Sequence, residues 1–274
     1  MSNFFANKQT VDTVEEDRVG GGFKLLDTDI YNAVIKQAYM RPSAKGAMGV
    51  TVILDIDGHE HSETIYISNA KGELTYQVKK NGKPVKDANG KPKLANLPSY
   101  NLINSLCLAA LGANVDMLEI DEKLVGIYDY TTKSKVPTKV ESFTELCGVK
   151  IAVVIQKQVV DKTAKNDSTG AYEPTGETRE QNVIVKFLTE DHHLTIAEVS
   201  KFITDKGSTL QSVVDNDQFF NAVGKMNEEH SVYAKEWLDK NKGETYVKAK
   251  AKPSNNTNST GSSKPDDDPF KNLD

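Results

Sequence analysis

The sequence predicts a mainly β fold: a small antiparallel barrel with one internal helix, followed by a short helical region and a disordered acidic tail. Two observations predict the barrel. Segments across residues 23–190 alternate polar and apolar side chains, as half-buried strands do. One short amphipathic helix, Ser99–Leu111, interrupts them, and such a helix is typical of the plug of a small barrel.

The first strand is predicted at Asp29–Arg41, where polar and apolar residues alternate. Successive residues of a strand point to opposite faces of the sheet. We therefore expect Ile35, Tyr39 and Arg41 on one face and Ala38 on the other.

A meander of antiparallel strands follows. Gly46–Asp57 is rich in β-branched residues, and the Asp57-Gly58 pair turns the chain into a third strand at Glu60–Ser68. A further hairpin is expected because Leu74–Lys80 is extended and Asn81-Gly82 is a strong turn sequence.

The internal helix has clear end signals, since Pro98 suits its first turn and Gly112 directly follows its last apolar residue. Strands resume after the helix, and a polar loop separates the last two. The expected strands are Leu124–Thr131, Glu145–Asp161 and Gln181–Leu188, and the expected loop is Lys162–Arg179.

Helical spacing replaces strand alternation from Thr195 to Asn241. This region is open to three interpretations: a second packing layer, a homodimer contact or a partner surface. Trp237 lies at helical spacing from Tyr233, so we expect it to anchor packing rather than stack on a base. The predicted organisation is a lead (1–22), a core (23–190), a helical extension (191–242), a linker (243–264) and a tail (265–274).

The C-terminal segment indicates a protein-binding motif on a linker. Lys248–Lys264 contains no large apolar side chain, so ordering it would cost backbone entropy with no buried area in return. We expect this linker to be disordered. The tail beyond it offers three carboxylates and one aromatic ring to partner proteins: Asp266, Asp267, Asp268 and Phe270.

Charge is distributed unevenly along the chain, whose formal net charge is -5. Between Lys71 and Lys93 there are seven lysines against two acids, whereas the tail is acidic. A basic surface with an acidic tail suggests that the tail competes for that surface. The alternative is that residues 71–93 form only a solvated hairpin.

The cysteines and hydropathy indicate the compartment. Cys107 and Cys147 both lie in apolar surroundings, which predicts buried free thiols in a reducing compartment. No run of 18 apolar residues occurs, and residues 1–10 lack the features of a secretory signal. We expect a cytoplasmic protein with no membrane partner.

Several segments of the core carry a family resemblance. Gly90–Leu108 is followed by Tyr128-Asp129-Tyr130 and Lys133–Pro137, and Gly148–Val160 and Pro174–Arg179 extend the similarity. Together, over about residues 20–190, they resemble bacteriophage-encoded single-stranded DNA-binding proteins. The resemblance implies an OB-fold-like core that coats transient single strands during phage DNA replication, recombination and repair in the infected host cell.

The end of the chain resembles the acidic tips of bacterial and phage single-strand binders, although Lys271–Asp274 follows Phe270 here. This resemblance implies that the tail recruits replication or recombination proteins: a polymerase, a primase-helicase, a nuclease or a recombinase.

Binding a single strand requires cationic groups for the phosphates and aromatic faces for the bases. Tyrosines on the predicted strands lie near lysines and arginines, although a tyrosine on a sheet is commonly a core or rim residue. The predicted DNA-binding residues are Tyr39, Arg41, Tyr66, Tyr76, Lys79, Lys80, Lys83 and Lys157.

Enzymatic signatures are missing from the sequence, which has no Walker loop, no nucleophile elbow and no HExxH motif. His59-Glu60-His61 and His192-His193 lack further ligands at convincing spacing. We expect no catalytic residues, no metal and no cofactor. The first alternative is a phage structural or adaptor protein that uses the barrel for protein contacts. The second is a DNA-processing enzyme, which would need clustered carboxylates.

Overall fold

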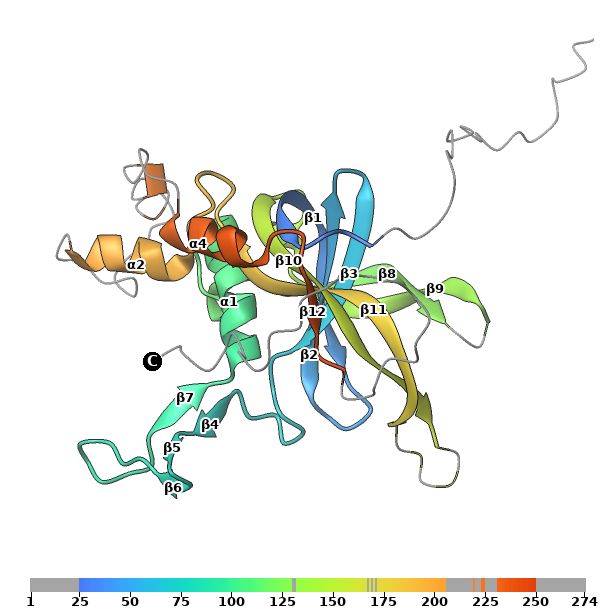
Figure 1. The fold of residues 1–274 in the computed structure, drawn as a ribbon, viewed down its shortest axis with the longest axis horizontal. Coiled ribbons are helices and arrows are strands. Elements are labelled where there is room, and N and C mark those ends of the chain that lie inside the picture. Colours follow the sequence, from blue (N-terminus) through green and yellow to red (C-terminus); the bar gives the residue numbers. More distant parts are fainter. Residues whose placement is uncertain are drawn as a thin grey trace, which may run out of the picture.

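The computed structural model describes residues 25–129, 132–166, 168, 170, 172–205, 219, 223, 224 and 231–249. The described chain is mainly β, and its strands pair antiparallel except for one short parallel pair. The strands are β1 (Asp29–Pro42), β2 (Met48–Ile56), β3 (His59–Tyr66), β4 (Thr75–Gln77), β5 (Lys79–Lys80), β6 (Lys83–Pro84), β7 (Leu94–Asn96), β8 (Asp121–Asp129), β9 (Ser134–Ser142), β10 (Lys150–Lys165), β11 (Tyr172–Leu188) and β12 (Thr245–Val247) (Figure 1). The α-helices with described bounds are α1 (Pro98–Leu111), α2 (Ile196–Asp205) and α4 (Val232–Asn241), and Val115–Met117 and Thr144–Leu146 form 3-10 turns.

β1 organises the main sheet. One edge pairs with β2 over Val34–Pro42, and the other pairs with β10 over Asp29–Val34 before meeting β9 at Tyr39. β3 adds beyond β2 and β11 beyond β10, which gives the order β11-β10-β1-β2-β3. The predicted meander β1-β2-β3 is therefore confirmed.

A β-bulge changes which residues of β1 face the core. The register between β1 and β2 shifts around Lys36, so that Ile35 and Ala38 both pack into the core. Tyr39 and Arg41 consequently lie on the outer face. The prediction that Ile35 shares their face is wrong, because one extra residue in a strand reverses the alternation beyond it.

The longest ribbon lies partly where a loop was predicted. β10 and β11 pair out to Lys165 and Tyr172, so most of the polar stretch 162–179 is strand. β9 was not predicted either. Its residues are mostly exposed and include Pro137. In both ribbons the outer residues are solvated on both sides, and the alternation that marks a half-buried strand disappears.

Helix α1 covers one end of the sheet through contacts with β3, β10 and β11. Ile103 and Leu106 enter the core between the strands. Gly112 ends the helix in the left-handed conformation, with φ of 66°, and its N–H donates to Leu108 O at 2.9 Å. The helix, its proline start and its glycine stop are confirmed.

The two cysteines differ in environment. Cys107 on α1 is buried, and burial raises the pKa of its thiol to about 12. Cys147 is exposed, so the prediction of burial is wrong for this residue. It follows a 3-10 turn where a strand was expected, and Leu146 is the residue of that turn that enters the core.

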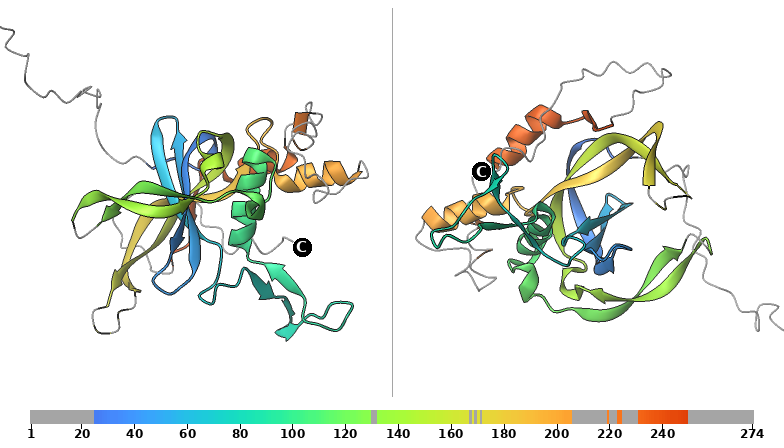
Figure 2. Two further views of the ribbon diagram at one scale, coloured as in Figure 1. Left: turned by 180° about the vertical axis from the view of Figure 1, so that it is seen from behind. Right: turned by 90° about the horizontal axis from the view of Figure 1, so that it is seen from below.

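The sheet curls strongly (Figure 2), but among the described residues no hydrogen-bonded ladder joins β3 to β11. The predicted mainly β, antiparallel fold is therefore confirmed, but a closed barrel is not observed among the described residues. A side chain bridges the two strands instead: Glu63 Oε2 on β3 accepts a hydrogen bond from the Ile184 N–H on β11, at 2.7 Å.

Helix α4 packs on the outside of the sheet. Trp237 is 8% exposed and contacts Ala152, Val154 and Leu188, which confirms its expected role as a packing anchor. The predicted lead and tail lie outside the described residues. No helix in the described ranges is long and apolar enough to cross a membrane.

Candidate nucleic-acid interface

The strand register brings two predicted binding residues together on the outer face. Arg41 on β1, Gly49 on β2 and Tyr66 on β3 are direct cross-strand neighbours, here called the Arg41–Gly49–Tyr66 row. Arg41 is exposed and Tyr66 is 44% exposed, whereas Gly49 is buried between them. A cation and an aromatic ring therefore lie in one row, the combination that single strands require.

The adjacent row holds Tyr39, Thr51 and Thr64. The two threonine hydroxyls lie 2.8 Å apart and form a hydrogen bond. Tyr39 is only 4% exposed and also lies opposite Ser142 of β9. Tyr39 thus offers no open ring face to a base, and it supports the sheet beside the row that does.

A lysine arm leaves the sheet next to the Arg41–Gly49–Tyr66 row. The arm, Leu74–Leu97, contains β4 to β7 and projects away from the main sheet beyond α1 (Figure 1). Its base is closed by the Leu97 N–H, which donates to Leu74 O at 2.9 Å. The Asn81-Gly82 turn has φ of 51° and 77°, which confirms the predicted hairpin turn.

The arm carries six exposed lysines, and Lys71 just before it is exposed as well. All seven lysines between Lys71 and Lys93 are exposed, and none forms an ion pair within the described residues. The two acids of this segment serve turns: Asp87 Oδ1 accepts the Lys91 N–H at 2.8 Å, and Glu73 Oε2 accepts the Asn69 side-chain N–H at 2.7 Å.

The remaining predicted residues of this surface lie on the arm. Lys79, Lys80 and Lys83 surround its turn, and Tyr76 on β4 is 46% exposed. Ser99 Oγ at the start of α1 donates to Tyr66 O at 2.6 Å. This bond holds the Tyr66 backbone against the chain just after the arm, so the base of the arm lies close to the Tyr66 end of the row.

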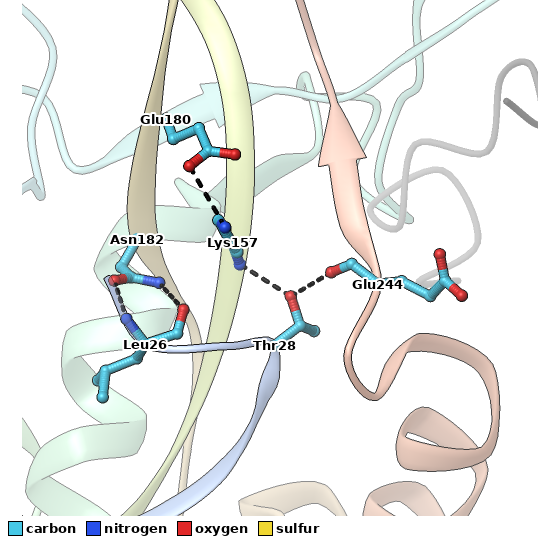
Figure 3. Close-up of polar contacts among 6 residues, drawn as sticks. All are labelled: Leu26, Thr28, Lys157, Glu180, Asn182 and Glu244. Atoms are coloured by element: carbon cyan, nitrogen blue, oxygen red, sulfur yellow. Dashed lines mark hydrogen bonds and ion pairs between the residues drawn. The ribbon is translucent and has the colours of Figure 1, made fainter. Parts of the chain in front are cut away.

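Lys157 lies elsewhere, toward the end of the sheet where Asp29 of β1 pairs with β10. Its Nζ is 3.3 Å from Glu180 Oε2, and its side chain is only 23% exposed (Figure 3). Its backbone N–H donates to Thr28 Oγ1, which in turn donates to Glu244 O. Lys157 therefore helps to fasten the segment before β12 to the sheet, and the structure does not bring it to the other predicted residues.

A tyrosine and a lysine also lie opposite each other on the β8–β9 ribbon. Tyr128 is directly opposite Lys135, and Gly126 lies beside Lys135. The sequence places Tyr128 and Lys135 near each other, and the register makes them neighbours. Tyr130 lies outside the described residues.

One histidine from each of the two sequence pairs makes a polar contact, and the two contacts involve different partners. His61 Nε2 is 3.5 Å from Glu63 Oε2, and His193 Nε2 is 3.2 Å from Asn32 Oδ1. Within the ranges that the structure describes, no three metal-ligating side chains gather.

Gly49 is the residue of the interface that the sequence analysis missed. A glycine inside a strand signals a bulge or a close approach, and here it signals the close approach of Tyr66.

In comparisons with known proteins, no protein-family model matches this chain, and no curated protein matches it.

Proposed function

We propose that this protein is a non-enzymatic single-stranded DNA-binding protein of phage type. It coats transient single strands in DNA replication, recombination and repair, in the cytoplasm of an infected host cell. The observation that carries the proposal is the Arg41–Gly49–Tyr66 row, which presents an exposed cation and an exposed ring, with the base of the lysine arm close to its Tyr66 end. Exposed rings and exposed cations close to one another are what sequence-tolerant binding of single strands requires.

The arrangement of the strands supports this function. We interpret the order β11-β10-β1-β2-β3, with α1 following the meander, as an OB-fold-like core whose last seam is bridged by Glu63. OB-folds are partly open barrels that bind oligonucleotides on one face of the sheet and its loops. The outer face of β1, β2 and β3 is that face in this interpretation.

The tail gives the protein its partners in this proposal. Asp266, Asp267, Asp268 and Phe270 recruit replication or recombination proteins, and the same carboxylates compete with DNA for the lysine arm. Removing residues 265–274 should strengthen single-strand binding at low salt and abolish recruitment. Equal affinity with and without these residues would exclude the competition.

The test is fluorescence anisotropy with a labelled oligo-dT, a duplex competitor and a salt series. We expect preference for the single strand and an affinity that falls steeply with salt. Changing Lys79, Lys80 and Lys83 to Gln should reduce the magnitude of the log–log salt slope by about 2, because each lost phosphate contact removes about 0.7 for a single strand.

A matched control changes Lys123, Lys235 and Lys240 to Gln. These lysines are also exposed, lie outside the arm and form no ion pair among the described residues. The net charge changes equally, so a local role of the arm predicts a smaller effect for the control. Equal effects would mean that general charge, not the arm, attracts DNA. The absence of single-strand binding by the full chain would refute the function.

One observation favours a second candidate, a phage structural or adaptor protein. Met117, Ile120 and Leu124 are exposed apolar side chains in and just before β8. These residues lie within eight positions of the chain, and a contiguous patch of exposed apolar side chains indicates a protein contact. A full chain that ignores oligo-dT but self-associates or binds a phage protein through these residues would support this candidate.

A further inference from the structure

The Tyr66 ring lies over a gap in the layer of side chains on the sheet, and Gly49 provides that gap. A methyl group at Gly49 would lie 2.9 Å from Thr64 Cγ2, 3.1 Å from Tyr66 Cδ1 and 3.2 Å from Arg41 O. Interiors packed this closely do not absorb such contacts without a shift. Gly49 is not among the residues with positive φ, so the proximity of Thr64, Tyr66 and the Arg41 carbonyl, rather than backbone conformation, favours glycine here.

The backbone at Tyr66 is fixed as well. Its carbonyl accepts the Ser99 hydroxyl at 2.6 Å, and the following Ile67 N–H donates to Met48 O at 2.9 Å. The backbone that carries the ring is thus ordered before any ligand arrives. A group that is already ordered loses little conformational freedom on binding.

We propose that Gly49 is a positioning residue for single-strand binding: it lets the Tyr66 ring lie against the sheet beside Arg41, where the ring stacks on one unpaired base. This inference rests on the proposed function. It makes Tyr66 the principal stacking residue of the outer face, since Tyr39 in the next row is buried. Arg41, at the other end of the row, binds a phosphate of the same strand.

The experiment replaces Gly49 with alanine in the full chain and measures oligo-dT binding. We expect the dissociation constant to rise about 5-fold to 150-fold, the range for one lost base stack. The salt slope should stay the same, because the change removes no cationic side chain. Gly126→Ala is the matched control, since its methyl group would lie 3.6 Å from Lys135 Cβ in ordinary contact.

A double-mutant cycle separates positioning from general damage. Tyr66→Ala should weaken binding at least as much as Gly49→Ala, and Gly49→Ala should add little once the ring is gone. Fully additive losses would overturn the inference. Tyr66→Phe should retain affinity, because the ring face rather than the hydroxyl stacks on the base.

Folding of each variant is checked by circular dichroism. If Gly49→Ala is unfolded, the cycle is repeated in a chain that also carries Thr64→Ser. This second change removes the Cγ2 group that the new methyl group would meet, but it keeps a hydroxyl for Thr51. If this also fails to fold, loss of binding in Tyr66→Ala with retention in Tyr66→Phe supports the stacking role, and equal binding by both overturns it.

An unmodified chain that does not bind refutes the proposed function itself. A chain that binds normally, needs the arm lysines and tolerates Tyr66→Ala refutes only this inference.

Discussion

At the scale of single residues, Glu198 connects the two described helices that follow the strands. Its carboxylate accepts hydrogen bonds from the Thr195 N–H at 2.8 Å, the Ser231 hydroxyl at 2.7 Å and the Tyr233 N–H at 3.1 Å. Burial alone would raise the pKa of Glu198, but these hydrogen bonds outweigh it and hold the pKa below its usual value. One carboxylate thus caps α2 and also satisfies the start of α4.

The first prediction follows from this lowered pKa. A carboxyl group whose pKa is depressed by folding stabilises the protein above its unfolded pKa, and this contribution is lost as pH falls through the folded pKa. Glu198→Gln should therefore lower the free energy of unfolding by about 1 kcal/mol at pH 7, and the deficit should shrink at acidic pH. Urea denaturation across pH measures both. Glu236→Gln, an exposed change on α4, is the control, and a deficit that stays constant with pH would contradict the prediction.

At the scale of elements, the sequence predicts best where one side of an element is buried. α1 and the β1-β2-β3 meander bury one face, so their periodicity is visible in the sequence. β9 and the outer part of the β10–β11 ribbon have solvent on both sides, and their cross-strand pairing leaves no hydrophobic pattern. The same limit holds for the site: the sequence supplies Arg41 and Tyr66, but only the register shows that Gly49 lies between them.

Trp237 is the most deeply buried large side chain that α4 packs on the sheet, and it gives the second prediction. Trp237→Ala should lower the free energy of unfolding by about 3 to 5 kcal/mol, because it leaves a cavity where the ring packs against Ala152, Val154 and Leu188. Trp237→Phe keeps much of the apolar volume and should cost less. Denaturation followed by far-ultraviolet circular dichroism suits both variants, since Trp237 is the only tryptophan. Equal stability of Trp237→Ala and the unmodified chain would mean that α4 is held by its other contacts.

At the scale of the whole molecule, β1 divides its second edge between two ribbons. β10 pairs with its first half and β9 meets its second half, so both ribbons start from the same central strand. The bulge around Lys36 lies between these two pairings. It also turns Tyr39 and Arg41 outward, so the bend that shapes the sheet also determines which side chains face a ligand.

The remaining seam of the molecule, between β3 and β11, gives the third prediction. Ile184 is 3% exposed, and its N–H bonds to the Glu63 carboxylate rather than to a strand carbonyl. Glu63→Ala would leave this buried donor without its acceptor, at a cost of about 1 to 3 kcal/mol. Glu63→Gln retains an acceptor oxygen and should cost less. Amide hydrogen exchange should show the Ile184 N–H exchanging faster in Glu63→Ala. Glu60→Ala on the same strand is the control, since Glu60 is exposed and, in the part of the chain that the structure describes, forms an ion pair only with Lys36. Unchanged protection at Ile184 would mean that packing alone holds β3 against β11, and the outer face of β3 that carries Tyr66 would then not depend on this side chain.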